Sequence, residues 1–318
     1  MRITTRSAAL AVILMPALAP AARVPAPAFI KASDHFYYLE FAPGTPNTGA
    51  VVTSEGVLLI DPPPDAGTPA LLSALKAVTS RPVRWVVLTD YQRARAGGAA
   101  TFVKQGAALI CSKELNRLAT AASAPGPDTA PPQAPDESDP RFVFGGQLHL
   151  FPAGIEIRII AIRHKARTAG DVIVFVPSEK VLQVGDLFNP ATYPIIDNGP
   201  GEGSAPGWID GLKQAIESVP LLKSAMPQPK PEPTAPPEPE LTMEETVTVI
   251  PAYGAAANLQ QMKSLLAVVV KLRAEAARAV AAGRDRETFV RLLAADPYGA
   301  YGNLEAFAGR LFDDLQRK

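Results

Sequence analysis

Short runs of β-branched and aliphatic residues alternate with helix-patterned segments along most of this chain. In the first half, apolar runs at 49–52 and 57–60 flank a turn at 54–56, and another strand is expected at 85–88. Between these strands, apolar residues at helical spacing predict a helix with Thr68 as its N-cap. Strands that alternate with helices favour sheets with helices packed on their faces, which is an α/β architecture.

The second half repeats this alternation, which predicts two similar layers packed together. A long helix is expected from Leu259 to Gly283, and a last helix carries apolar residues from Leu304 to Leu315. The strands expected in this half are residues 156–162, 171–176, 181–184 and 246–250.

The composition excludes several classes of protein. The chain has 318 residues, 47% of them hydrophobic, with 31 Lys+Arg against 31 Asp+Glu, so it is neither disordered nor basic enough for a nucleic-acid partner. A single cysteine, Cys111, excludes a disulfide framework, and its apolar strand-like surroundings predict a buried residue. The three histidines are His35, His149 and His164.

The first 21 residues have the pattern of a secretory signal peptide. Arg2 and Arg6 precede an apolar run at 8–18, and small residues follow at 19–21. Cleavage there predicts a periplasmic or secreted protein with no membrane attachment; the alternative is an N-terminal membrane anchor. The apolar run is shorter than the roughly 20 residues that a permanent membrane-spanning helix needs.

Two proline-rich segments do not fit a packed core. Residues 124–140 are rich in Pro, Asp and Ala, and residues 220–245 include seven prolines between positions 227 and 239. Proline in a polar setting favours extended polyproline II structure, so both segments are expected to be exposed loops. The second is either a solvated insertion or a ligand for the aromatic groove of a protein partner.

Several short strings occur in a characteristic order and spacing. They are Ile60-Asp61, Leu88-Thr89 followed by Gly97-Gly98, Thr168-Ala169-Gly170-Asp171, Val184-Gly185-Asp186 and Val249-Ile250-Pro251. Together they resemble the metallo-β-lactamase fold family. The resemblance implies a single domain over residues 29–318, with helices at 258–318, built as an αββα four-layer sandwich with the proline-rich loops as insertions. It also implies a zinc-dependent hydrolase.

The metal-binding residues that this resemblance implies are almost all replaced. In the family, a His-x-His-x-Asp-His run surrounds one or two zinc ions, which accept imidazole and carboxylate ligands. Here the four ligand positions of that run are occupied, in order, by Asp90, Gln92, Ala94 and Arg95. Two further histidine positions are occupied by Arg167 and Tyr253, so that only Asp186 is the residue the family would use.

The replacements predict a site without metal and without assigned catalytic residues. A guanidinium has no lone pair to donate and stays charged, so Arg95 and Arg167 cannot be ligands. Either they pair with Asp90 and Asp186 as a structural plug, or they form an anion pocket for a small molecule with Arg93, Gln92 and Tyr253. His164 is expected to pack at a strand end rather than to bind metal.

Two functions are compatible with these residues. One is a non-catalytic exported protein that binds a ligand or a partner on this scaffold. The other is a hydrolase with altered chemistry. It would use either a weakly bound metal ion at Asp90, Gln92 and Asp186 or metal-free acid–base catalysis by Asp90 or Asp186. Oxygen ligands alone suit Mg, Ca or Mn better than zinc, and the adjacent arginines oppose all of them.

Overall fold

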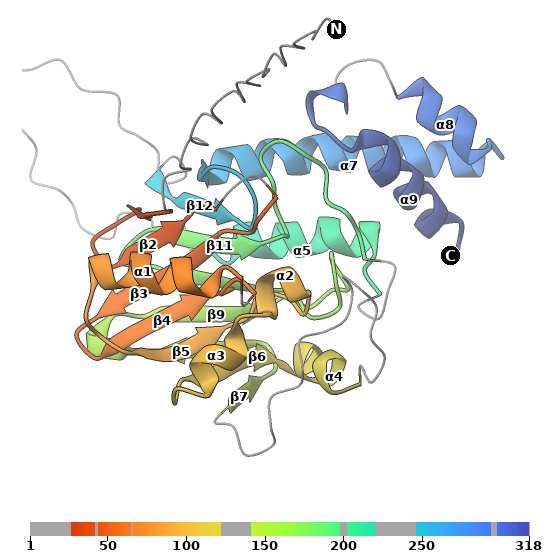
Figure 1. Ribbon diagram of the computed structural model, residues 1–318. Helices are drawn as coiled ribbons and strands as arrows, with labels where there is room; N and C mark the ends of the chain where they lie inside the picture. Colours follow the sequence, from red (N-terminus) through yellow and green to blue (C-terminus); the bar gives the residue numbers. More distant parts are fainter. Residues whose placement is uncertain are drawn as a thin grey trace, which may run out of the picture.

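The computed structural model describes residues 27–41, 44–64, 66–121, 141–197, 202–219, 246–293 and 298–317. Two β-sheets pack face to face, and helices cover their outer faces (Figure 1). This arrangement confirms the expected α/β four-layer sandwich. The expected signal peptide at 1–21 and the proline-rich segments at 124–140 and 220–245 lie outside the described residues.

The first sheet has seven strands in sequence order, β1 to β7. Strands β1 to β4 pair antiparallel, whereas β4 to β7 pair parallel. The strands are β1 (Phe29–Lys31), β2 (Phe36–Leu39), β3 (Thr48–Thr53), β4 (Gly56–Ile60), β5 (Val83–Val87), β6 (Ala108–Ser112) and β7 (Arg141–Phe144).

The second sheet has six strands in the order β13-β12-β11-β10-β9-β8. Its one parallel pair is β11 with β12, so the carboxyl ends of these two strands lie at the same edge. The strands are β8 (Gln147–Leu150), β9 (Ile157–Ala161), β10 (Val172–Val176), β11 (Val181–Gly185), β12 (Thr248–Pro251) and β13 (Ala257–Asn258).

Helices α1 to α4 belong to the first half of the chain, and helices α5 to α9 belong to the second half. The long helix α7 begins with a capping box, in which the Asn258 side chain accepts from the Gln261 amide and the Gln261 side chain accepts from the Asn258 amide. The helices are α1 (Thr68–Val78), α2 (Arg93–Ala96), α3 (Ala99–Val103), α4 (Lys113–Ala121), α5 (Ala205–Glu217), α7 (Leu259–Ala281), α8 (Arg286–Leu292) and α9 (Leu304–Gln316), with short 3-10 turns at Pro152–Gly154 and Tyr298–Ala300.

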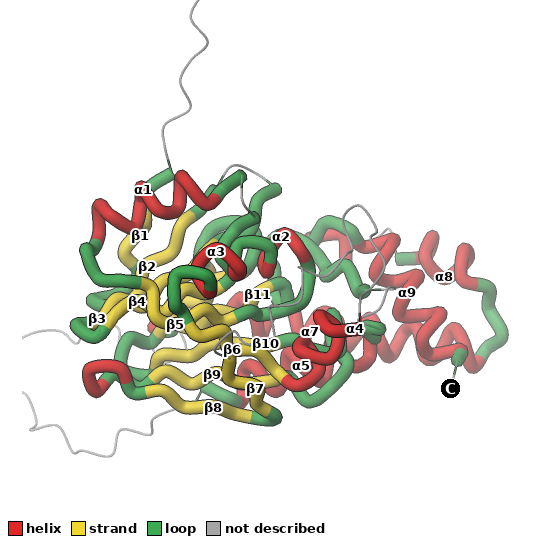
Figure 2. Tube along the Cα trace, turned by 60° about the horizontal axis from the view of Figure 1, so that its bottom comes forward, coloured by secondary structure: helices red, strands yellow, loops and turns green. Residues whose placement is uncertain are grey.

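Three apolar cores hold the four layers together. Val51, Ile159 and Val174 belong to the core between the sheets. A second core joins the first sheet to α1, α3 and α4, and a third joins the second sheet to α5, α7 and α9. Helices α7, α8 and α9 also extend to one side of both sheets (Figure 2). In the part of the chain that the structure describes, no helix is both long enough and apolar enough to cross a membrane.

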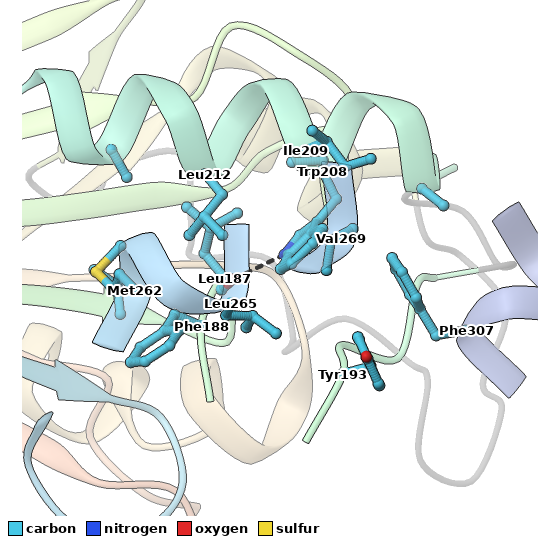
Figure 3. Packing of buried hydrophobic residues seen from close by; sticks show 14 of the residues in the cluster. Leu187, Phe188, Tyr193, Trp208, Ile209, Leu212, Met262, Leu265, Val269 and Phe307 are labelled. Carbon is cyan, nitrogen blue, oxygen red and sulfur yellow. Dashed lines mark hydrogen bonds between the residues drawn. The ribbon is translucent and has the colours of Figure 1, made fainter. Parts of the chain in front are cut away.

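Trp208 of α5 lies at the centre of the third core (Figure 3). Its side chain is fully buried, and its indole N–H donates to the Leu187 carbonyl at 2.7 Å. Phe307 of α9 packs edge-on against the indole and is stacked on Tyr193. The segment that follows β11 is therefore fixed between α5 and the C-terminal helices.

The sequence located most elements and missed some boundaries. Gly67, not Thr68, is the N-cap of α1, and Thr68 is its first residue. The sequence pattern predicts a helix over residues 209–218, but helix α5 begins at Ala205, because Ser204 caps it by accepting from the Gly207 amide. The edge strands β7 and β8 and the short helix α8 were not predicted, because they are short and their apolar residues are partly exposed.

Candidate functional site: an arginine–aspartate cluster

The predicted site residues lie at one edge of the sandwich, where parallel strands end. Asp90 follows β5, Asp186 directly follows β11, and Tyr253 follows β12. Arg95 lies in α2, and Arg167 lies between β9 and β10. Crevices at the carboxyl ends of parallel strands are the usual place for a ligand in α/β proteins.

Arg95 is the most buried member of this site, with no exposed surface. Its Nε donates to Asp90 Oδ2 at 2.7 Å, and its Nη2 contacts the same carboxylate and donates to Gln92 Oε1 at 2.5 Å. Nη1 lies 3.4 Å from the Tyr253 hydroxyl and 3.6 Å from Asp186 Oδ2. The guanidinium therefore reaches acceptors from three different loops.

Arg167, in the connection between β9 and β10, contacts the same two carboxylates. Its Nη1 lies 3.3 Å from Asp90 Oδ2, and its Nη2 donates to Gln92 Oε1 at 2.9 Å. Its Nε is 2.5 Å from Asp186 Oδ2, a close ion pair that lacks the alignment of a hydrogen bond. Asp90 Oδ2 and Gln92 Oε1 are thus each shared by both arginines.

We call Asp90, Gln92, Arg95, Arg167 and Asp186 the arginine–aspartate cluster. All six guanidinium nitrogen atoms lie within 3.6 Å of an acceptor in the cluster or of the Tyr253 hydroxyl. Two positive and two negative charges balance within it. Buried ions are tolerated when they are paired and hydrogen-bonded in this way.

The charges of the cluster are mutually stabilising. Burial lowers the pKa of Arg95, but the charges of Asp90 and Asp186 outweigh it and raise this pKa above its ordinary value. Asp90 is almost fully buried, whereas the Asp186 side chain is 17% exposed and marks the solvent side of the cluster. Tyr253 stands at the margin, with its ring centroid 5.9 Å from Arg95 Cζ, and burial raises the pKa of its hydroxyl.

Other residues considered in the sequence lie elsewhere. Arg93 is exposed at the start of α2 and is not a member of the cluster, although the pocket interpretation included it. His164 is exposed, His35 pairs with Glu179 at 2.8 Å, and His149 pairs with Glu156 at 2.9 Å. Cys111 is buried in β6, and burial raises the pKa of its thiol to about 11.

Two buried carboxyl groups beside the cluster were not predicted as site residues. Asp61 accepts from the amide of Thr89 at 2.8 Å and from its hydroxyl at 2.5 Å. Asp171 accepts in the same way from Thr168, at 2.9 Å and 2.6 Å. Burial raises the pKa of each carboxyl to about 7, although the threonine hydrogen bonds oppose this change and the charge of Asp90 adds to it.

The positions of these two pairs explain their importance. Thr89 immediately precedes Asp90, and Thr168 immediately follows Arg167, so each buried carboxyl fixes a loop that carries a cluster residue. In the sequence, Asp61 and Asp171 served only as marks of a resemblance. The sequence feature that could have identified these two pairs is a threonine adjacent to a replaced ligand position.

A further loop closes the cluster from the side of the C-terminal helices. The Tyr91 hydroxyl donates to the Asp197 carboxylate, and the Asp197 amide donates to the Arg167 carbonyl at 2.9 Å. The Ser204 amide donates to the Ala166 carbonyl, also at 2.9 Å. Arg167 is thus held through its backbone as well as through its guanidinium.

Comparison with known proteins identifies the scaffold. The family model described as the metallo-beta-lactamase superfamily matches residues 42–226, more than half of the chain. The chain belongs to the metallo-beta-lactamase superfamily. A search of curated proteins gave no significant match.

Solved structures of this superfamily share the fold at low sequence identity. A metallo-beta-lactamase from Pontibacter korlensis is 18% identical, with a TM-score of 0.55, over 76% of this chain and 98% of that one. The DIM-1 metallo-beta-lactamase is 16% identical, with a TM-score of 0.54, over 78% and 99%. The inverting sec-alkylsulfatase Pisa1 from Pseudomonas sp. is 14% identical, with a TM-score of 0.66, over 90% of this chain but only half of that protein.

The residues of the cluster do not fit the zinc ions that the superfamily implies. At the positions that the resemblance assigns to ligands, two guanidinium groups lie between Asp90 and Asp186 and contact the Oδ2 atom of each carboxylate. Among the described residues, no three His, Cys, Asp or Glu side chains converge in a group that could hold a metal ion. A cation would have to displace fixed positive charges, so no chemical step is assigned to a metal here.

Proposed function

We propose that this protein is a non-catalytic member of the metallo-beta-lactamase superfamily whose former metal centre is closed by the arginine–aspartate cluster. The observation that carries this proposal is that every guanidinium nitrogen of Arg95 and Arg167 has an acceptor at a former ligand position or beside it. The arginines supply the positive charge that metal ions supply elsewhere in the superfamily. The cluster then stabilises the fold instead of activating water.

The same geometry favours a plug over an anion pocket. An anion needs guanidinium donors that are free and reachable, but Arg95 is fully buried and Arg167 is 5% exposed. A carboxylate or phosphate would have to replace Asp90 or Asp186, which are already in place. In the closed state, binding of an anionic small molecule at this site is therefore unfavourable.

The biological role that we propose is binding of a partner by an exported protein. The signal-peptide pattern at residues 1–21 supports export to the periplasm or the medium. The proline-rich segment at 220–245 supports a protein partner that recognises extended proline-containing chains. Fractionation of cells that express the full chain tests export, and retention of the protein in the cytoplasm would contradict it.

Hydrolysis assays test the loss of catalysis. Because the structural neighbours include metallo-beta-lactamases and an alkylsulfatase, the substrates to use are a chromogenic β-lactam and a secondary alkyl sulfate, each with and without added zinc. We expect no turnover above the buffer rate. Turnover that is lost in Asp186→Asn but kept in the exposed control Asp34→Asn would overturn the proposal and favour the altered hydrolase.

A further inference from the structure

The carboxyl groups around the cluster outnumber its cations. Asp61, Asp90, Asp171 and Asp186 lie near Arg95 and Arg167, so full ionisation would leave two negative charges uncompensated. Asp90 and Asp186 are paired with the arginines. Among the residues that the structure describes, Asp61 and Asp171 have only threonine donors and form no ion pair.

Each of these two carboxyls lies near one negatively charged and one positively charged side chain. Asp61 faces Thr89, with Asp90 and the guanidinium of Arg95 further away. Asp171 faces Thr168, with Asp90 and Arg167 further away. A carboxylate buried without its own cation is costly, and a proton removes that cost.

The hydrogen bonds suit a protonated carboxyl as well as an ionised one. A threonine hydroxyl can donate to a carboxylate or accept from a carboxylic acid. The oxygen–oxygen distances of 2.5 Å for Thr89 and 2.6 Å for Thr168 are at the short end for such bonds. In the structure both hydroxyls donate to the carboxyl oxygens, so loss of the proton to solvent would leave these bonds in place and add a negative charge near Asp90.

We propose that Asp61 and Asp171 form a proton-dependent latch that keeps the arginine–aspartate cluster closed. In the protonated state they hold Thr89 and Thr168, and through them the loops that carry Asp90 and Arg167. When both lose their protons, the excess negative charge loosens residues 89–96 and 163–171 and exposes both guanidinium groups. The plug and the anion pocket are then two states of one site, closed in mild acid and open in mild alkali.

This inference rests on the proposed closure of the former metal centre, so its test must separate the two. Hydrogen exchange of the backbone amides, corrected for the intrinsic pH dependence, is measured on the purified protein at about pH 5 and about pH 9, on either side of the expected transition. Strong protection of residues 89–96 and 163–171 at the lower pH tests closure. A fall in that protection at the higher pH tests the latch.

We expect protection of these two segments to fall about tenfold or more between the two pH values, while that of α7 changes less than about twofold. Asp61→Asn and Asp171→Asn imitate the protonated carboxyl, and the double variant should keep its protection at the higher pH. Asparagine suits the positive φ of 54° at position 61, so the fold should tolerate this substitution. Asp34→Asn, an exposed carboxyl, is the matched control and should behave as the wild type.

Three results would overturn the latch. They are constant protection in the wild type, an equal loss of protection over the whole fold, or a loss in the double variant as large as in the wild type. The wild-type profile alone decides the matter if a variant does not fold. Weak protection of both segments at the lower pH would instead refute the closed cluster itself.

Discussion

Replacement of Arg95 by methionine should destabilise the protein strongly. Methionine has a similar length and no charge, so the substitution tests the charge of the guanidinium more than its volume. In Arg95→Met, Asp90 would keep only Arg167, at 3.3 Å, as a cation. A buried carboxylate then loses its closest partner.

The expected cost follows from that burial. Removal of one partner of a buried ion pair costs about 3–5 kcal/mol of the free energy of unfolding, because the other charge stays buried. For a chain of this size, each kcal/mol lowers the melting temperature by about 2 °C, so Arg95→Met should melt about 6–10 °C below the wild type. The exposed Arg93 of the same short helix provides the matched control, and Arg93→Met should change the melting temperature by less than about 1 °C.

Thermal denaturation followed by circular dichroism measures both variants, and a double-mutant cycle completes the test. Asp90→Asn combined with Arg95→Met removes both charges, so the double variant should be less destabilised than the sum of the single variants by about 1 kcal/mol or more. Equal melting temperatures for Arg95→Met and Arg93→Met would refute the structural role of the cluster. Additive effects in the cycle would show that Asp90 and Arg95 do not interact.

Three further predictions concern the pH dependence of stability, a pair of glycines and the core around Trp208. Burial raises the pKa of Asp61 and Asp171 from 3.8 to about 7, so the folded state binds their protons more tightly than the unfolded state. The free energy of unfolding should therefore fall as the pH rises from about 4 to about 7, by about 4 kcal/mol for each group. Urea unfolding should show this fall, and Asp171→Asn should reduce it. Gly185→Ala should cost about 2–4 kcal/mol, because Gly185 has a φ of 55° and an added Cβ would lie 2.4 Å from a threonine hydroxyl oxygen. At Gly254 an added Cβ would meet open space, so Gly254→Ala introduces only backbone strain and should lower the free energy of unfolding in urea by about 1–2 kcal/mol. Equal losses at both glycines would contradict this reasoning. Trp208→Phe leaves a buried carbonyl without its donor and should cost about 1–3 kcal/mol in the same assay; an unchanged midpoint would contradict it.

The sequence predicted the layers of the fold because its apolar periodicity is strong where strands and helices are buried on at least one face. The strand that ends at Val87 and the helix that begins at Leu259 are both of this kind. Strands β7 and β8 lie at sheet edges and have four residues each. In β7 the apolar residues do not alternate with polar ones, and in β8 the alternation is too short to stand out.

The composition of the cluster was predicted largely from replaced ligand positions, because residues that once surrounded a common centre remain close when they are exchanged. Asp90, Gln92, Arg95, Arg167 and Asp186 are all brought together. Arg93 occupies no ligand position and was included only in the anion-pocket interpretation; it is exposed at the start of helix α2. Helical direction over four residues cannot be read from a motif alignment.

The choice between plug and pocket depended on side-chain geometry that no sequence pattern encodes. Both interpretations use the same arginines, and only the distances from each nitrogen to its acceptors separate them. The pairing of Thr89 with Asp61 depends on the fold, since these residues are 28 residues apart and meet only through the parallel pairing of β4 with β5. Thr168 and Asp171 are three residues apart, but their hydrogen bonds depend on side-chain geometry.

Metal content is the most direct test of the central claim that arginines have replaced the metal centre. The purified protein is incubated with zinc, manganese and iron, freed of excess ions and analysed by elemental mass spectrometry, with melting curves recorded before and after treatment with a chelator. We expect less than about a tenth of a metal ion per chain and an unchanged melting temperature. About one metal ion per chain, together with a melting temperature that falls on chelation, would contradict it.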